Sequence, residues 1–331
     1  MEFLILGGST FLSAAVAADA IGAGHSVTCF ARGLSGTVPI GAQFVQADRA
    51  SGTSAYQDVR RSWDAIVDVS TEPSFVREAL SVLGPLARHW TYVSSCSVYA
   101  DQDTPNADES TPTTEPLGLD EEPSPATYSA AKAACEAACR DSASGVLHLC
   151  RPGLIVGPGD PSDRFGYWPA RFAMTRSHPV LVPDTPDAAT QAIDVRDLAH
   201  WIVTSAAQRI TGTFNLVGNV VPLRAVLSSA SVAAGYSGHV VPVDSTWLVD
   251  HGVAPWSGEN SLPLWIPEGS GFAGFALRSS ARAEQMGLQR RSLVETMTAT
   301  LAYERGRGVD RPRGAGLNAA FEARLLEQWR L

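Results

Sequence analysis

The segment MEFLILGGSTFLSAAVAADAIGAGHSVTCFARG, residues 1–33, decides the expected fold. An apolar run at residues 3–6 precedes two glycines, a run of small helix-forming residues covers 11–23, and a second β-rich run covers 26–30. A strand, a glycine turn, a helix and another strand are the repeating unit of parallel sheets. The first 33 residues therefore predict the start of an α/β fold.

The same alternation continues to about residue 150. Further strands are expected at residues 42–46, 63–69, 90–94 and 146–150, and helices at residues 74–88 and 126–142. This layout predicts a doubly wound parallel sheet with helices on both faces. We expect residues 1–158 to form the nucleotide-binding domain, with residues 192–218 returning to it. Residues 159–331 are expected to form a smaller substrate-binding lobe with a terminal helix.

The composition excludes several classes of protein. With 25 basic and 34 acidic residues the net charge is −9, which disfavours binding to nucleic acid or to an anionic membrane surface. No apolar run is long enough to span a bilayer, and the first residues lack the pattern of a signal peptide. The five cysteines are an odd number at wide spacing, so we expect neither disulfides nor a metal site in a cytoplasmic protein.

The turn after the first predicted strand is a candidate phosphate-binding loop. Backbone N–H groups at a helix N-terminus favour a pyrophosphate, although Thr10 and Ser13 stand where the strict pattern has glycines. An ordinary strand–helix turn is the alternative. The full cofactor-binding set that we predict is Gly7, Gly8, Ser9, Thr10, Phe11, Leu12, Arg32, Asp48, Ser70 and Lys132.

Two residues of that set bear on the choice of cofactor. Ala31 and Arg32 follow the second strand, where an acid would favour NAD and an arginine pairs with the 2′-phosphate of NADP. We therefore favour NADP(H) over NAD(H), with a surface arginine as the alternative. Asp48 is a candidate contact to adenine or a solvated loop acid.

The strongest candidate for chemistry is the pair Tyr128 and Lys132 on a predicted helix. A spacing of four places both on one face, where an ammonium stabilises the phenolate needed for proton transfer. Lys132 is the only lysine among the 25 basic residues. Ser95, in YVSSCSVYA at the end of the fifth strand, is the candidate donor to the reacting oxygen.

Three later segments carry structural expectations. The acidic, proline-rich residues 101–124 are expected to form a surface loop beside the site, or scaffolding. Residues 305–314, rich in arginine and glycine, are expected to be a solvated connector. Phe321, Leu325 and Trp329 form one stripe of a terminal helix that docks on the body.

Together these motifs resemble the extended short-chain dehydrogenase/reductases, the NAD-dependent epimerase/dehydratase superfamily. The matching motifs are GGSTFLS, VSSCSVY, YSAAK, RPGLIVGP and IDVRDLA. GGSTFL and FARG look most like the actinobacterial branch with a GGTxFLG loop. The resemblance implies a Rossmann-like fold and a homodimer. It also implies Tyr128 as general acid/base, Lys132 as ribose ligand and Ser95 as partner of the substrate hydroxyl.

Departures from the family pattern limit the reaction. In the dehydratases an Asp-Glu pair follows the serine, but here Cys96 and Ser97 follow it, which disfavours dehydration. Cys96 is a second candidate proton donor or a buried strand cysteine. Arg164, Tyr167 and Trp168 are candidate substrate contacts for an anionic or ring-bearing small molecule, or part of a packed hinge.

Three functions remain open at this stage. The first is an NADP(H)-dependent oxidoreductase acting on a ketone or secondary alcohol of a sugar-like or secondary-metabolite substrate. The second is a sugar-nucleotide or nucleoside-type epimerase that keeps NAD tightly bound. The third is a non-catalytic NADP-sensing protein on the same fold.

Overall fold

The computed structural model describes residues 1–143 and 145–329 and divides into two compact units. The first unit comprises Met1–Leu154, Val195–Val217 and Arg278–Gln289. The second comprises Ile155–Asp194, Gly218–Leu277 and Arg290–Leu331. The short segment Arg278–Gln289 has no counterpart in the sequence-based division. None of the helices described is both long and apolar enough to cross a bilayer.

A seven-stranded parallel sheet forms the centre of the first unit and confirms the predicted fold class. Its order is β10-β6-β5-β4-β1-β2-β3. The strands are β1 (Glu2–Leu6), β2 (Ser26–Ala31), β3 (Gln43–Gln46), β4 (Ala65–Asp68), β5 (Trp90–Val93), β6 (Leu147–Pro152) and β10 (Gly212–Leu216). The order reverses between β1 and β4, and doubly wound sheets bind ligands at the carboxyl ends of strands around such a point.

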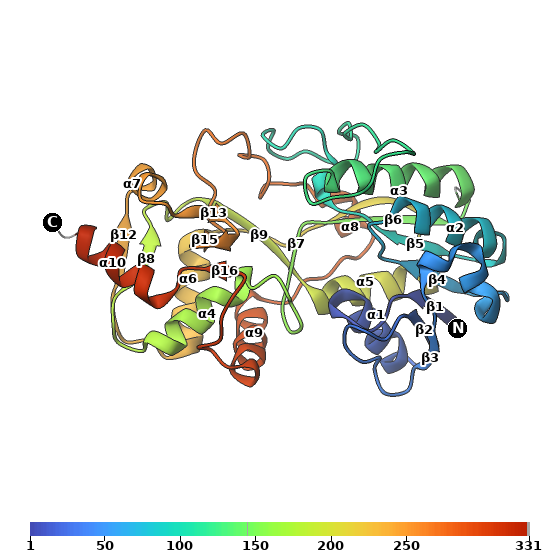
Figure 1. Ribbon diagram of the computed structural model, residues 1–331, viewed down its shortest axis with the longest axis horizontal. Coiled ribbons are helices and arrows are strands. Elements are labelled where there is room, and N and C mark those ends of the chain that lie inside the picture. Colours follow the sequence, from blue (N-terminus) through green and yellow to red (C-terminus); the bar gives the residue numbers. More distant parts are fainter. Residues whose placement is uncertain (144, 330–331) are drawn as a thin grey trace. The chain divides into compact units, whose positions relative to one another are not determined.

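Helices cover both faces of this sheet (Figure 1). Helices α1 (Phe11–Gly22) and α5 (Val195–Gln208) pack together on one face, while α2 (Pro73–Leu83) and α3 (Tyr128–Ala143) pack on the other. Helix α2 ends earlier than the sequence predicted, because Gly84 and Pro85 tighten the chain into the short 3₁₀ turn η2 (Gly84–Leu86). Two further 3₁₀ segments, η1 (Arg49–Val59) and η3 (Cys96–Val98), follow β3 and β5.

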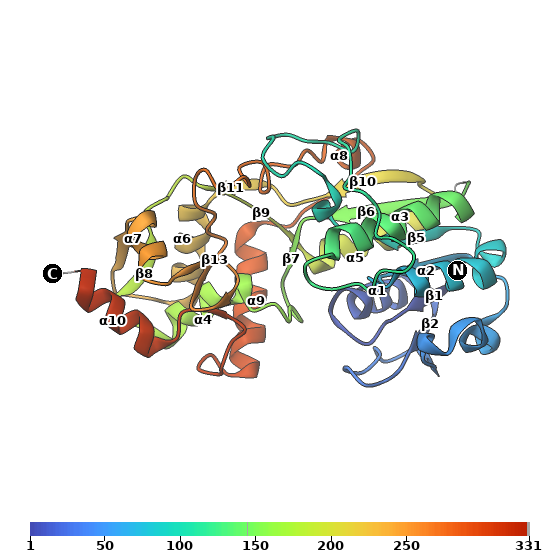
Figure 2. The same ribbon diagram turned by 45° about the horizontal axis from the view of Figure 1, so that its top comes forward.

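The returning segment lies at the edge of the sheet. Helix α8 (Ala281–Gln285) packs beside the edge strand β10, as Figure 2 shows. Residues 101–124 are irregular, as predicted, and they dock on the first unit. Leu117 donates its N–H to the Ala130 carbonyl and packs on Ala131 and Ala134 of α3, so this loop has a scaffolding role.

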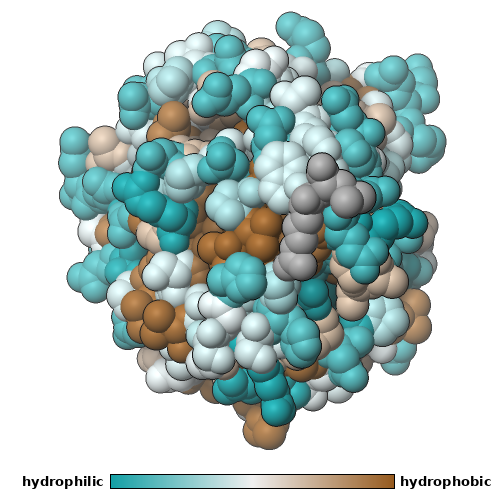
Figure 3. Space-filling model, turned by 90° about the vertical axis from the view of Figure 1, so that its left-hand side faces the viewer, coloured by the Kyte–Doolittle hydropathy of each residue, from teal (hydrophilic) through white to brown (hydrophobic). Residues whose placement is uncertain are grey.

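The second unit is built from helices and short strands. Its helices are α4 (Arg164–Thr175), α6 (Leu223–Ala234), α7 (Ser245–Asp250), α9 (Leu293–Arg307) and α10 (Ala319–Trp329). The strands outside the large sheet are β7 (Leu154–Val156), β8 (Val180–Pro183), β9 (Ala189–Asp194), β11 (Val220–Pro222), β12 (Val240–Val243), β13 (Ala254–Trp256), β14 (Gly258–Glu259), β15 (Ser261–Pro263) and β16 (Ala315–Gly316). Figure 3 shows one face of the molecule, where hydrophilic side chains surround a central apolar patch. Patches of this kind are common on folded proteins and alone indicate no partner.

The prediction of a solvated connector at residues 305–314 is correct only in part: six of the ten residues are exposed, but two arginines bind buried acids. Arg311 and Arg313 bind the buried carboxylates of Asp163 and Glu304, and their side chains are only 16% and 11% exposed. The composition was misleading because arginines that meet buried acids look the same in sequence as solvated ones.

The terminal helix α10 docks on the second unit, as expected. Leu325 is buried, and the exposed Trp329 ring meets Trp247 edge to face. The buried face also holds Glu322, which pairs with Arg171 and accepts the N–H of Leu181 at 2.8 Å. The apolar stripe alone therefore did not define the docked face.

Candidate functional site

The loop after β1 approaches β2 so closely that only glycine fits. Gly7 donates its N–H to the Phe30 carbonyl at 2.8 Å, and Gly7 and Gly8 have φ values of +130° and +97°. A Cβ on Gly8 would lie 2.4 Å from Cys29 Sγ. Larger residues would therefore be strained and would collide, which explains both glycines.

The N-terminus of α1 has the features of an anion site. Thr10 is the N-cap, but its hydroxyl makes no capping hydrogen bond to the first turn. Ser13 replaces a glycine without loss of packing, because its buried hydroxyl donates to the Thr10 carbonyl at 2.8 Å. Phe11 and Leu12 begin the helix, so the amides of this first turn lie beside the Gly8–Ser9 loop. The loop and helix dipole together fit a pyrophosphate.

Arg32 and Asp48 lie near the ends of β2 and β3. Arg32 is exposed, and its carbonyl accepts a hydrogen bond from Gln46 Nε2 at 3.0 Å. The Asp48 carboxylate accepts the Ala50 N–H at 3.0 Å and so caps η1. This capping role is one that the sequence-based reading of Asp48 did not include.

Lys132 lies at the carboxyl ends of two central strands. Its ammonium donates to the carbonyl of Ser70, just after β4, at 2.9 Å and to that of Val93, the last residue of β5, at 2.7 Å. The residue is 3% exposed, and burial lowers the pKa of the ammonium to about 8. Both acceptors are neutral carbonyls. The lone lysine is therefore a buried cation aimed at the strand ends, where doubly wound folds hold ligands.

Tyr128 is close to Lys132 in the sequence, and Ser95 is close to Val93, which accepts a hydrogen bond from Lys132. Tyr128 opens α3 one turn before Lys132 and is 37% exposed, so its phenol is accessible. Ser95 lies two residues beyond Val93 and is half-buried. The Ser95 hydroxyl accepts the Ser97 N–H and donates to the Ser97 hydroxyl, each at 3.1 Å. The hydrogen bond from Lys132 to Val93 thus ties α3 to the strand end that carries Ser95.

The sequence analysis did not predict a buried ion pair that joins α3 to β6. Glu136, one turn beyond Lys132 on α3, accepts two hydrogen bonds from Arg151 of β6, at 2.9 and 2.7 Å. Both side chains are nearly fully buried. Burial raises the pKa of the Glu136 carboxyl, but the hydrogen bonds and charge of Arg151 outweigh it and lower the pKa overall. The pair fixes α3 against β6, and the four-residue spacing from Lys132 was the available signal.

A second missed feature surrounds Tyr99. The guanidinium groups of Arg151 and Arg278 lie 4.8 and 4.9 Å from its ring centre, and its hydroxyl donates to Asn215 Oδ1 at 2.5 Å. Arg278 also donates to Gln102 Oε1 at 2.5 Å. These contacts hold the turn after Ser95, yet they join residues that lie between 52 and 179 positions apart, so no local pattern reveals them.

Cys96 lies inside this network. Its thiol is 5% exposed and donates to the Arg151 carbonyl at 3.2 Å. Burial raises the pKa of the thiol to about 12. The neighbouring Ser97, which is half-buried and bonded to Ser95, is the more accessible polar group.

The substrate candidates in the second unit differ in exposure. Tyr167 and Trp168 are 2% and 0% exposed, and the Trp168 indole donates to the Pro263 carbonyl at 2.9 Å. Arg164 is half-buried and lies 5.2 Å from the Trp256 ring centre. Across residues 1–143 and 145–329 no group of three or more His, Cys, Asp or Glu side chains is arranged to hold a metal ion.

Comparison with known proteins adds a family and several structural relatives. Residues 55–216 match the model of the NAD dependent epimerase/dehydratase family. No curated protein sequence matches the chain. Among solved structures, the Thermus thermophilus UDP-glucose 4-epimerase complex with NAD is 18% identical with a TM-score of 0.65, covering 93% of this chain and 100% of that one.

Two further epimerases share the fold. The Campylobacter jejuni UDP-Glc/GlcNAc 4-epimerase is 12% identical with a TM-score of 0.67, covering 92% of this chain and 99% of that one. The Bacillus cereus UDP-glucuronic acid 4-epimerase in complex with NAD is 13% identical with a TM-score of 0.65, covering 93% and 99%. At these identities the likeness establishes the fold alone.

Proposed function

Because the chain belongs to the NAD-dependent epimerase/dehydratase family, we propose that it catalyses reversible hydride transfer between a nicotinamide cofactor and a ketone or secondary alcohol. The substrate class is sugar-like or a secondary metabolite. The proposal rests mainly on the position of Lys132, whose buried ammonium lies at the carboxyl ends of β4 and β5. Lys132 is on the same helix as Tyr128, and it donates a hydrogen bond to Val93, two residues before Ser95.

The chain's own residues have separate roles in this proposal. Tyr128 gives a proton to, or removes one from, the substrate oxygen, and Ser95 hydrogen-bonds the same oxygen. Lys132 stabilises the phenolate by its charge and holds a ribose hydroxyl. The nicotinamide supplies hydride acceptance and return when bound. Gly7, Gly8 and the first turn of α1 would hold its pyrophosphate.

Arg32 supports NADP(H) and a reductase. It is exposed at the end of β2, where its guanidinium is accessible to the 2′-phosphate of a bound nucleotide. Replacing Arg32 with Gln should weaken NADPH binding while leaving NADH binding unchanged. Arg60→Gln, at another exposed arginine, is the matched control.

The structural relatives support a second candidate, an epimerase with NAD. Two of the solved epimerases above hold NAD, and epimerisation would use the same Ser95, Tyr128 and Lys132. An epimerase keeps its nicotinamide through turnover because the hydride that leaves the substrate must return to it. A reductase must exchange the cofactor.

Identification of the bound nucleotide separates these candidates. We would purify the protein without added nucleotide, denature it, and identify any released nucleotide by chromatography. Near-stoichiometric NAD supports the epimerase, which would then be assayed by NMR with UDP-glucose, UDP-galactose and UDP-glucuronate. An empty protein that binds NADPH more tightly than NADH supports the reductase. Binding of neither would refute both and favour a non-catalytic role.

Tyr128→Phe tests the proposed general acid/base. We expect turnover to fall at least about 10²-fold, because a positioned proton donor commonly contributes 10²–10⁴-fold. Nucleotide affinity, measured by calorimetry, should stay within about twofold, since the phenol is not placed in the phosphate site. Full activity in this variant would contradict the assignment of Tyr128.

A further inference from the structure

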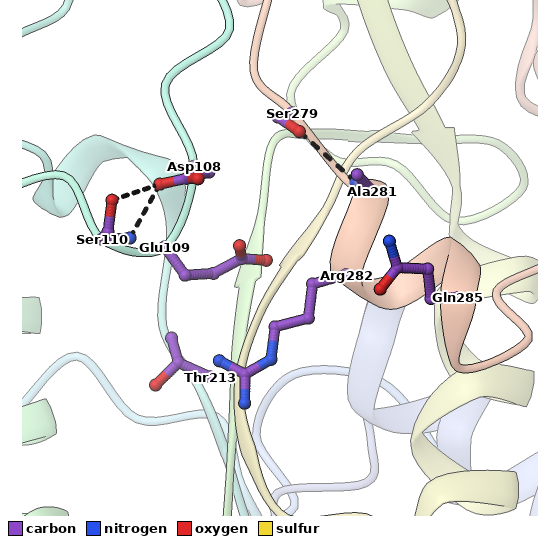
Figure 4. Close-up of a pocket in the computed structure, with 8 residues that line it drawn as sticks. All are labelled: Asp108, Glu109, Ser110, Thr213, Ser279, Ala281, Arg282 and Gln285. Atoms are coloured by element: carbon purple, nitrogen blue, oxygen red, sulfur yellow. Dashed lines mark hydrogen bonds between the residues drawn. The ribbon is translucent and has the colours of Figure 1, made fainter.

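A polar pocket of about 460 Å³ lies at the edge of the first unit, within the range of small-molecule sites. Three separate stretches of chain line it: the loop after β5, the edge strand β10, and the returning segment that carries α8 (Figure 4). Its lining residues are Asp108, Glu109, Ser110, Thr213, Ser279, Ala281, Arg282 and Gln285. None of them belongs to the proposed nicotinamide site.

Arg282 supplies the positive side of this pocket. Its guanidinium lies 4.9 Å from the ring centre of Phe214, and Nη2 is 2.8 Å from the place that a Cβ on Gly212 would take. Gly212, with φ of +116°, therefore leaves room for the guanidinium. Within the described parts of the chain Arg282 makes no ion pair, so packing against the strand holds it.

Glu109 and Asp108 supply the negative side. Glu109 points into the pocket, as does Arg282 (Figure 4), and its Oε1 accepts the Asn215 N–H at 2.6 Å. The Asp108 carboxylate accepts the hydroxyl and the N–H of Ser110 at 2.6 and 2.9 Å, and these hydrogen bonds lower its pKa. Both carboxylates are therefore fixed by hydrogen bonds to their own unit and do not pair with the guanidinium.

We propose that this pocket binds a small zwitterion of the α-amino-acid type. The ligand carboxylate pairs with the fork of Arg282, a geometry that guanidinium groups favour. The ligand ammonium lies towards Glu109, with Thr213 and Gln285 as further polar partners. A simple anion would face two carboxylates and a simple cation would face Arg282, so only a ligand with both charges matches both sides.

Calorimetry on the purified protein with its nucleotide bound tests this proposal. The probes are glycine, L-serine and L-glutamine, with acetate and methylammonium as the two halves. We expect saturable binding of at least one amino acid and at least tenfold weaker binding of each half. Because this experiment measures binding only, it succeeds or fails independently of the proposed hydride transfer.

Matched variants locate the site. Arg282→Gln and Glu109→Gln should each weaken amino-acid binding at least tenfold, and Glu109→Gln retains an oxygen for the Asn215 N–H. Arg282→Lys should give an intermediate loss, because it keeps the charge but not the fork. Exposed residues elsewhere in the first unit supply the controls, Arg60→Gln and Glu115→Gln, which should bind as wild type does.

Three results would overturn the proposal. The first is no binding of any of the three amino acids, and the second is equal binding of acetate or methylammonium. The third is unchanged affinity in the folded Arg282→Gln and Glu109→Gln variants, with folding checked by thermal melting. A direct Glu109–Arg282 pair in solution, detected as coupling in a double-mutant stability cycle, would also count against it.

Discussion

Buried charged side chains have different kinds of partner in the two units of the molecule. In the first unit, Lys132 is 3% exposed and both of its hydrogen bonds go to neutral carbonyls. In the second unit, Asp163 and Glu304 are 6% and 2% exposed and lie among Arg307, Arg311 and Arg313, which we call the arginine cluster. In the first region the hydrogen-bond partners of the buried charge are neutral, whereas in the second region the buried charges form ion pairs.

We expect this difference to distinguish a residue used for chemistry, Lys132, from residues that stabilise the fold, the arginine cluster and its acids. Burial lowers the pKa of Lys132 to about 8, so the charged form is held at a free-energy cost, and strongly shifted groups of this kind cluster at functional sites. At Asp163 burial raises the pKa, but the hydrogen bonds from Arg311 and from the Gly314 N–H, together with the charges of Arg311 and Arg313, outweigh burial and lower the pKa overall. An ion-paired cluster of this kind joins α4 and α9, and we expect its members to matter for folding and not for catalysis.

The largest predicted effect tests this contrast directly. Glu304→Gln leaves buried arginines without their full counter-charge, so we expect the free energy of unfolding to fall by about 3–5 kcal/mol. Lys132→Met removes a cation that burial disfavours and whose hydrogen-bond partners are neutral, so its stability should change by less than about 1 kcal/mol while nucleotide binding is lost. Urea unfolding and nucleotide titration measure both.

Hydrogen exchange shows where each variant acts. In Glu304→Gln, protection should fall in α4 and α9 of the second unit and persist in the sheet of the first. Equal destabilisation by the two variants would remove the distinction between the regions, because Lys132 would then be as structural as Glu304.

The sequence predicted the first unit far better than the second. The strands of the first unit are short apolar runs separated by glycines. The predicted bounds of β1, β2 and β5 agree with the structure almost residue for residue. The arginine cluster could not be predicted, because Asp163 meets Arg311 and Arg313 about 150 positions away. The composition of residues 305–314 does not distinguish arginines that are solvated from arginines that pair with buried acids.

In the candidate site, too, some residues could be predicted from the sequence and others could not. Tyr128, Lys132 and Ser95 were found because their spacing and the single lysine are visible in the sequence. Arg278 and Asn215 were missed because they reach Tyr99 only through the tertiary fold. The candidate residues for chemistry lie in short local motifs, whereas the residues that hold these motifs in place make their contacts only in the folded structure.

A second prediction extends the contrast to titration of the first unit. His148 is fully buried beside His89, Cys150 and Trp201, and the Trp201 indole donates to its Nε2 at 3.2 Å. Burial lowers the pKa of this imidazole to about 3. The unfolded chain therefore binds a proton more readily, and the stability present above pH 6.5 is lost as the pH falls towards 3.

Protein unfolding at two pH values measures this effect. At pH 5 the loss from His148 alone is about 2 kcal/mol relative to pH 8, from the linkage between proton binding and folding. His148→Leu should flatten this part of the pH dependence. The exposed His200, replaced by Gln, should leave it intact. A wild-type protein equally stable at both pH values would show that the imidazole is not buried in its neutral form.

The smallest predicted effects compare two helix caps, one in each unit. Ser292 caps α9 in a capping box with Glu295, and Asp48 caps η1 through the Ala50 N–H. Replacing either with Ala should lower stability by about 1 kcal/mol.

Only Asp48 is also a predicted adenine contact, and Asp48→Asn keeps an acceptor for the cap while removing the charge. If Asp48 binds the cofactor, this variant keeps its melting temperature and loses nucleotide affinity, whereas Ser292→Ala does the reverse. Unchanged nucleotide affinity in Asp48→Asn would show that Asp48, like Ser292, acts only as a helix cap.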